Sequence, residues 1–370
     1  ILKRKERCDI DLPQYHTSEK LRGKELLQVI WNLGKAERPA LILEETEDAP
    51  LQIAGNADDM ERCYQIAIHR YNTTLQGRDD NYNSLVTGIG THIIPCALGG
   101  KERVFQDGHK YLENPIIYSV DDVDNIKKPN ILDGLLGKQI RLIEYFANKT
   151  NGKIPIRVGD IQNPLGLAEM IWETNDFYIS LYEHPGKVHQ LLELLCETVI
   201  EYIDAMKAVC DNLCPLTWPL IWAPKEKGIY IADDTMSMVS PEMYEEFGVK
   251  YNNIISREFG GLMLHSCTMN ERYFGKIIKN ESLRSVNFAS QYSSDMSSIY
   301  DYFGGKAVIL PHYQHGDNPQ IGTEIEFLEK IKTCWKPEYP TIIYISSNLQ
   351  GGRQDAVLTA YNRLFGKIEQ

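Results

Sequence analysis

Short apolar stretches of strand length alternate along the chain with longer stretches in which apolar residues recur at helical spacing. The predicted strands are 40–44, 92–98, 154–158, 219–221 with 229–232 nearby, 261–265, 283–288, 307–310 and 341–345. This alternation predicts a parallel sheet built from βα units, and a set of about eight strands fits an α/β fold of the closed (β/α)8 TIM-barrel type. An open doubly wound sheet is the alternative. We prefer the barrel because of the strand count and because no Gly-x-Gly-x-x-Gly follows a predicted strand.

The helix patterns are clearer than the strand patterns. In the segment 188–203, aliphatic residues recur every three or four positions and glutamates occupy the other side, which predicts an amphipathic helix. Ser240, Pro241 and Glu242 form a typical helix start, with an N-cap, a proline at the first position and an acid in the first turn. We also expect helices at 21–33 and 356–365, and a long surface loop at 76–83.

These patterns predict one barrel domain at 39–370, preceded by an N-terminal helical extension at 1–38. The chain has 370 residues, of which 43% are hydrophobic, enough for a sizeable core. Its net charge of −12 argues against nucleic acid as a partner, since phosphate backbones call for a basic surface. No apolar run is long enough to span a membrane, and the charged start is not followed by the apolar segment of a signal peptide.

The cysteines are scattered and show no spacing that is typical of a disulfide framework, so we expect a reducing, cytoplasmic setting. Two of the most informative polar residues, His265 and Cys267, stand at the end of the apolar segment 261–265. Residues two apart on a strand point the same way, so an imidazole and a thiol would lie side by side. Both groups are preferred zinc ligands. The pair therefore predicts a metal site, although His-x-Cys alone is a common chance pattern.

Active sites of (β/α)8 barrels lie at the carboxyl ends of the strands. The polar residues predicted near these ends are Glu44, Glu45, Cys96, Asp160, Asn163, Asp233, Asp234, Asn287, His312, Tyr313, His315, Ser346, Ser347 and Asn348. Asp234, Glu44 and Asp160 are the candidate catalytic acids, and Asn163, His312, Tyr313 and Asn348 are candidate substrate contacts. Each also has a structural explanation: Asp233 and Asp234 suit the start of a loop, and Tyr230, Tyr313 and Tyr344 suit packing.

Four segments together resemble the uroporphyrinogen decarboxylase superfamily. They are 231–247 (Ile-Ala-Asp-Asp-Thr-Met-Ser-Met-Val-Ser-Pro-Glu-Met-Tyr-Glu-Glu-Phe), 160–169, 176–185 and 117–123. The resemblance extends from about residue 20 to the end and implies a (β/α)8 barrel. A Ser-Pro helix start followed by a strand that ends in His-x-Cys is similar to the methylcobamide:coenzyme M methyltransferase branch. That branch implies zinc on His265 and Cys267, with a corrinoid carried by a partner protein.

The branch usually supplies its third zinc ligand from a cysteine just after the last strand, where this chain has Ser346, Ser347 and Asn348. Catalytic zinc typically has three protein ligands. The candidates for the third ligand are Glu44, Cys96, Asp233, Asp234 and His312. An oxygen or nitrogen ligand would make the zinc a harder Lewis acid, which suits an oxygen-bound methyl donor better than a coenzyme M thiolate.

The resemblance thus leads us to expect a zinc-dependent methyltransferase that moves a methyl group between a small molecule, as methyl donor or thiol acceptor, and a corrinoid. The first alternative is a metal-free decarboxylase. It would need cationic groups at the mouth, such as Arg157 or Arg353, and the Arg-Gln-Ala-Gly-Arg type motif of true uroporphyrinogen decarboxylases is missing near 39–45. The second alternative is a non-catalytic barrel that only binds a corrinoid or a partner protein.

Overall fold

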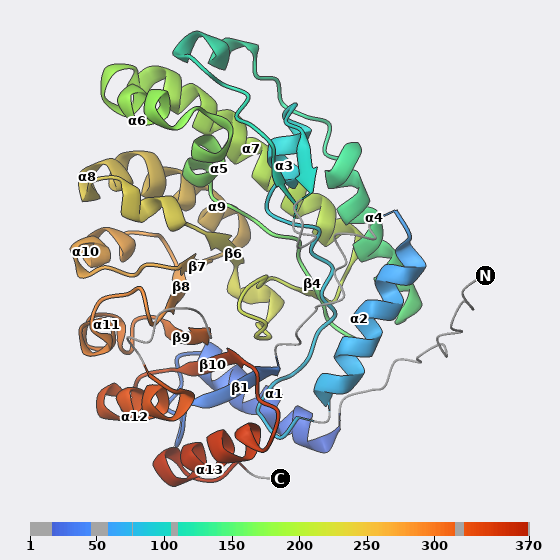
Figure 1. The fold of residues 1–370 in the computed structure, drawn as a ribbon, viewed down its shortest axis with the longest axis vertical. Coiled ribbons are helices and arrows are strands. Elements are labelled where there is room, and N and C mark those ends of the chain that lie inside the picture. The colour runs from blue at the N-terminus through green and yellow to red at the C-terminus, as the bar shows by residue number, and fades with distance from the viewer. Residues whose placement is uncertain (1–16, 46–57, 76, 105–109, 315–321, 369–370) are drawn as a thin grey trace.

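A computed structural model describes residues 17–45, 58–75, 77–104, 110–314 and 322–368. Its main element is a six-stranded parallel sheet in the order β1-β10-β9-β8-β7-β6 (Figure 1). These strands are β1 (Ala40–Glu45), β6 (Ile229–Ala232), β7 (Leu262–Ser266), β8 (Leu283–Ala289), β9 (Val308–Gln314) and β10 (Ile342–Ser347). Strands β7 and β10 are buried along their whole length, as expected where a parallel sheet is covered on both faces.

The gap between β1 and β6 is closed by shorter segments. Strands β4 (Ile156–Arg157) and β5 (Leu213–Cys214) pair in parallel with each other. On the β1 side, the Asp80 amide donates to the Leu41 carbonyl at 2.9 Å. Leu85 then forms a parallel bridge to Ile156. On the β6 side, the Tyr230 amide donates to the Pro215 carbonyl at 2.9 Å. These segments close the ring of strands between β1 and β6, which confirms a (β/α)8-type barrel rather than an open sheet.

Helices surround these strands (Figure 1). They are α1 (Ser18–Trp31), α2 (Met60–Leu75), α3 (Ile93–Ala97), α4 (Gly134–Lys149), α5 (Pro164–Ile171), α6 (Thr174–Glu183), α7 (Pro185–Val209), α8 (Pro241–Met243), α9 (Lys250–Phe259), α10 (Phe274–Ile277), α11 (Met296–Phe303), α12 (Glu324–Cys334) and α13 (Arg353–Phe365). An antiparallel hairpin, β2 (Glu102–Val104) and β3 (Lys110–Leu112), lies apart from the barrel sheet. Across the described ranges, none of the helices combines the length and the apolar character needed to cross a bilayer.

The predicted helices are confirmed. Helix α7 buries the aliphatic face that the spacing predicted, and α1 and α13 cover the expected terminal segments. The hydroxyl oxygen of Ser240 accepts a hydrogen bond from the Met243 amide at 3.2 Å, with Pro241 at the first helical position, so the predicted start of α8 is also confirmed. These local signals succeeded because capping and amphipathic spacing act within a few residues of each other.

Two strand predictions are wrong. The segment 92–98 contains the short helix α3, with Ile93, Ile94 and Pro95 buried. A short apolar run is equally compatible with a buried helix, and Pro95 fits a first helical turn. The segment 219–221 forms no strand and follows a cis peptide bond between Trp218 and Pro219. The strand at this point of the barrel is β5, at Leu213–Cys214.

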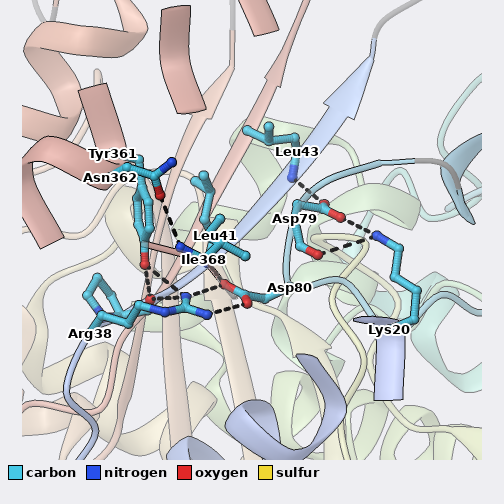
Figure 2. Close-up of polar contacts among 10 residues, drawn as sticks. Lys20, Arg38, Leu41, Leu43, Asp79, Asp80, Tyr361, Asn362 and Ile368 are labelled. Carbon is cyan, nitrogen blue, oxygen red and sulfur yellow. Dashed lines mark hydrogen bonds and ion pairs between the residues drawn. The ribbon is translucent and has the colours of Figure 1, made fainter. Parts of the chain in front are cut away.

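The predicted surface loop at 76–83 is an irregular segment over residues 77–83, but most of it is buried; Gln76 lies outside the described residues. Figure 2 shows the reason: Asp79 and Asp80 face the edge of β1. One oxygen of Asp80 accepts from the Leu41 amide and one oxygen of Asp79 accepts from the Leu43 amide, each at 2.9 Å. The two carboxylates thus take the place of a neighbouring strand.

Cations on two other segments balance these buried acids (Figure 2). Arg38 donates two hydrogen bonds to Asp80, at 2.6 and 2.8 Å, and Lys20 lies 2.5 Å from an oxygen of Asp79. The hydroxyl of Tyr361, on α13, donates to the Pro39 carbonyl beside this network. A buried carboxylate needs such partners, because an unpaired charge away from water is very costly.

Candidate metal centre

His265, Cys267 and Asp234 come together at the carboxyl ends of two neighbouring strands. Strand β7 carries His265 and leads directly to Cys267, and β6 leads to Asp234 at the start of a 3-10 helix, Asp234–Met238. The register pairs Ala232 with His265, so the residues after each strand meet at the same edge. His265 is buried, whereas Asp234 and Cys267 retain contact with solvent.

The three side chains each offer a ligand atom, and these atoms all lie within 4.8 Å of one another. The Sγ of Cys267 is 3.5 Å from Nε2 of His265. An oxygen of Asp234 accepts a hydrogen bond from the Cys267 amide at 2.5 Å, which holds the carboxylate beside the thiol. Among the described residues, this is the only group of three or more such side chains with a metal-binding arrangement.

Asn287 on β8 orients the His265 ring. Its amide nitrogen donates to the Leu310 carbonyl at 2.7 Å, which turns its Oδ1 toward His265. That oxygen lies 2.5 Å from Nδ1 of His265. Because an amide oxygen only accepts, Nδ1 carries the proton and Nε2 keeps its lone pair facing Cys267. Metal-binding histidines are commonly held this way by a partner on the other ring nitrogen.

The electrostatics of the cluster favour a cation. Partial burial of the Cys267 thiol, together with the neighbouring Asp234 carboxylate, raises its pKa to about 12. Burial also raises the pKa of Asp160, with an opposing effect from His265 and a reinforcing one from Asp234. A divalent ion would offset the repulsion between thiolate and carboxylate, and the oxygen, nitrogen and sulfur donors present fit zinc with an open fourth position.

The other candidates for the third ligand lie elsewhere. Asp233 is fully buried, and one of its oxygens accepts from Tyr244 and from Asn252, both at 2.9 Å. Burial raises its pKa to about 6. Cys96 sits on α3, where burial raises its pKa to about 11. His312 does stack on His265, with ring centroids 5.9 Å apart, but its Nδ1 faces the Asn287 amide nitrogen at 3.3 Å.

The predicted substrate contacts include three residues with local structural contacts. The side chain of Asn163 caps α5 by accepting from the Gly166 amide at 2.7 Å. The Tyr313 hydroxyl donates to the Gly322 carbonyl at 3.0 Å, and the Asn348 side chain accepts from the Gln350 amide at 3.1 Å. His315 lies outside the described residues.

The candidate acids occupy two different places. Asp160 accepts from the Gln162 side chain at 2.7 Å, and the charges of His265 and Asp234 both act on its pKa, which places it on the same side of the barrel as these two residues. Glu44 instead hydrogen-bonds to Tyr344 and to Ser346, on the β10 side of the barrel.

Sequence reasoning missed two aromatic residues near these groups. Tyr230 stacks on His265 with centroids 6.1 Å apart, although we expected it only to pack in the core. Trp218 lies edge-on to His312 at 6.2 Å and to Tyr344 at 5.4 Å, and thus joins the two sides of the barrel mouth. No local signal marks Trp218, since it stands in a loop between β5 and β6.

Comparisons with known proteins agree with this architecture. Residues 61–214 match the family described as uroporphyrinogen decarboxylase (URO-D). The resemblance to the uroporphyrinogen decarboxylase superfamily is confirmed over these residues. A curated uroporphyrinogen decarboxylase from Ruthia magnifica subsp. Calyptogena magnifica is 25% identical over 179 residues, which cover 45% of this chain and 46% of that protein. The match thus spans about half the length of this relative.

The fold is also similar to a solved structure described as a methyltransferase from Methanosarcina mazei. The TM-score is 0.67, and the alignment covers 93% of this chain and 99% of that one. Sequence identity is 13%, so the likeness establishes the shared fold rather than a shared reaction.

Proposed function

We propose that this protein is a zinc-dependent methyltransferase that moves a methyl group between a small molecule and a corrinoid carried by a partner protein. The observation that carries this proposal is the Asp234–His265–Cys267 cluster at the barrel mouth, with Nε2 of His265 already facing the thiol. Support also comes from the superfamily match and from the likeness in fold to a methyltransferase.

Asp234, His265 and Cys267 would hold the zinc through oxygen, nitrogen and sulfur. When bound, the zinc would act as a Lewis acid on the heteroatom that carries or accepts the methyl group. Asp160 would act as the general acid, since burial raises its pKa and favours the protonated carboxyl group. A methyl donor that loses its methyl group leaves as an anion, and the Asp160 proton would neutralise it.

The first test is metal content. Purified wild-type protein should hold about one zinc per chain, and Cys267→Ser should lose most of it because a hydroxyl is a poor zinc ligand. Cys334→Ser is a matched control, since Cys334 lies on α12 away from the cluster. Substitution with cobalt(II) should give a thiolate-to-metal absorption band in wild type and in Cys334→Ser, but not in Cys267→Ser. Wild type without stoichiometric zinc and without this band would end the proposal.

The second test follows the methyl group. Incubation with reduced cobalamin and a methylated donor, or with methylcobalamin and a thiol, should change the cobalt spectrum in wild type and much less in His265→Ala. Binding of methylcobalamin with no change of alkylation state would favour the non-catalytic barrel.

Two observations bear on the decarboxylase alternative. Arg353 already donates two hydrogen bonds to Glu324, at 3.1 and 2.8 Å, which occupies one of the two cations that a carboxylated substrate would need. Arg157 remains, buried in the barrel with an Nε that has no partner. Release of CO2 from a tetrapyrrole by the metal-free protein would favour a decarboxylase, and methyl transfer without CO2 release would exclude it.

A further inference from the structure

A second feature of the barrel mouth lies on the side opposite to β6 and β7. A cavity of about 450 Å³ is bounded by the ends of β1, β9 and β10, by the inner face of α2 and by the segment 81–86. Its wall includes Glu44, Arg70, Ser84, Arg157, Trp218 and Tyr344. Since it opens at the carboxyl ends of the strands, it lies at the same end of the barrel as the metal centre.

Arg157 is the buried cation of this cavity, with 2% of its surface exposed. One terminal nitrogen donates to the carbonyls of Leu216 and Ile221, each at 2.8 Å. Its Nε has no hydrogen-bond partner, and within the described ranges no carboxylate forms an ion pair with it. A guanidinium offers five N–H donors and cannot readily lose its charge, so a buried one calls for an acceptor, best an anion.

The neighbouring acid Glu44 does not meet that need. One of its oxygens accepts from the hydroxyls of Tyr344 and Ser346, and the other faces Arg70 at 3.5 Å. Its charge is therefore balanced at the rim, where Arg70 is partly exposed. Arg157 donates to two carbonyls and, at 4.0 Å, to the Sγ of Cys214, and none of its hydrogen bonds goes to a carboxylate.

Two further polar atoms in the cavity wall are buried without a partner. They are the hydroxyl oxygen of Ser84 and the side-chain oxygen of Asn81. Buried polar atoms in native proteins nearly always have partners, so several partnerless ones around one cavity call for a polar ligand or ordered water there. The Asn81 oxygen only accepts, so it would face a donor and not a carboxylate. Arg157 and Ser84 both offer donors, and a carboxylate would accept from both.

Aromatic rings lie between the cavity and the metal centre. Trp218 lines the cavity and lies edge-on to His312, which in turn stacks on His265. Trp218 therefore separates Arg157 from the side of the barrel mouth that carries Cys267 and His265.

We propose that Arg157, assisted by Ser84, binds the carboxylate of a small organic acid, which is the methyl donor or acceptor of this enzyme. The substrate class rests on the proposed function, whereas the carboxylate site itself does not require a metal. The carboxylate fixes one end of the molecule, and its methyl-bearing heteroatom points across Trp218 to the metal ligands.

The test compares methoxyacetate with methoxyacetamide, which has the same shape without the charge, by calorimetric titration of the metal-free protein. We expect methoxyacetate to bind and methoxyacetamide to bind roughly tenfold to a hundredfold more weakly. Arg157→Lys should lose a similar factor, since lysine lacks the second donor of the fork. Ser84→Ala should weaken binding severalfold without changing the thermal midpoint, and Ser285→Ala, another buried serine on β8 that does not line the cavity, should leave binding unchanged.

Equal binding of the charged and neutral probes, or full affinity in both Arg157→Lys and Ser84→Ala, would overturn the carboxylate site. A folding defect in Arg157→Lys leaves the Ser84→Ala comparison decisive. The same titration on His265→Ala separates the two proposals, because the carboxylate site predicts unchanged binding there. If zinc binding fails while methoxyacetate still binds selectively, the carboxylate site stands and the methyltransferase does not. If zinc binds while methoxyacetate binds no better than methoxyacetamide, the methyltransferase stands and the carboxylate site does not.

Discussion

Nδ1 of His265 lies 2.5 Å from Oδ1 of Asn287, and the two residues face each other on the neighbouring strands β7 and β8. The same Asn287 side chain points its nitrogen at Nδ1 of His312, 3.3 Å away. One amide therefore sets the protonation of two imidazoles: His265 carries its proton on Nδ1, and His312 accepts at Nδ1. This arrangement leaves Nε2 of His265 as the nitrogen available to a metal.

Replacing Asn287 should weaken metal binding without removing any ligand. Asn287→Leu removes the acceptor that orients His265, and loss of such a partner typically costs about 10- to 100-fold in metal affinity. Asn287→Asp keeps an oxygen toward His265 and should retain affinity much closer to wild type. Competition with a chromophoric zinc chelator measures both. Equal affinities for wild type and Asn287→Leu would show that the Asn287 contact does not support the metal site.

Asp234 should contribute a metal ligand and not only a turn. Asp234→Asn preserves the size of the side chain and can still accept from the Cys267 amide, but it removes the negative charge from the cluster. We expect zinc affinity to fall while the thermal midpoint of the metal-free protein changes little. Asp355→Asn, an exposed acid on α13, is the control and should keep full affinity. Unchanged zinc binding in Asp234→Asn would leave the metal with two protein ligands.

The location of the candidate metal centre was easier to predict from the sequence than its third ligand. The strand that ends in His265 and the following Cys267 could be recognised because alternation along a strand is a local rule. The choice between Asp233 and Asp234 could not be made, since neighbouring residues turn to opposite sides and the sequence does not say which one faces the mouth. The structure turns Asp233 toward Tyr244 and Asn252, and Asp234 toward Cys267.

The burial of the predicted surface loop at 76–83 was also beyond prediction from local sequence. Gly, Asp and Asn are typical of exposed turns, and the segment 76–83 is rich in them. Asp79 and Asp80 are buried because β1 lacks a continuous neighbouring strand on that side, and its amides need acceptors. Such a need arises only from the closed barrel, with Lys20, Arg38 and the loop brought together from distant positions (Figure 2).

Asp80 should be important for stability. Its carboxylate accepts from Arg38 and from the Leu41 amide, and its side chain is only 3% exposed. Asp80→Ala would leave a largely buried guanidinium and a buried amide without their partner, which should lower the free energy of unfolding by about 3–5 kcal/mol. The exposed ion pair of Arg78 with Asp355 is the matched control, and Asp355→Ala should cost about 0–1 kcal/mol. Urea unfolding of both variants tests this, and similar losses would contradict the structural role of Asp80.

His312 should make the protein sensitive to acid. Burial, together with the neighbouring His265, lowers the pKa of His312 to about 3, so the folded state keeps this imidazole neutral. An unfolded histidine takes up a proton below about pH 6.5. Between these values the unfolded state binds more protons, so stability contributed by His312 is present near neutral pH and is lost as the pH falls.

His312→Gln should remove this dependence. Relative to the variant, wild type should lose about 1.4 kcal/mol of unfolding free energy per pH unit below about pH 6, with a constant difference above about pH 7.5. Urea unfolding at a series of pH values measures the difference, and His184→Gln, at an exposed position after α6, should follow wild type. Parallel pH profiles for wild type and His312→Gln would mean that the His312 ring accepts a proton in the folded barrel. The positive charge on His312 would then repel a metal cation at His265, so the same series of unfolding measurements also bears on the metal centre.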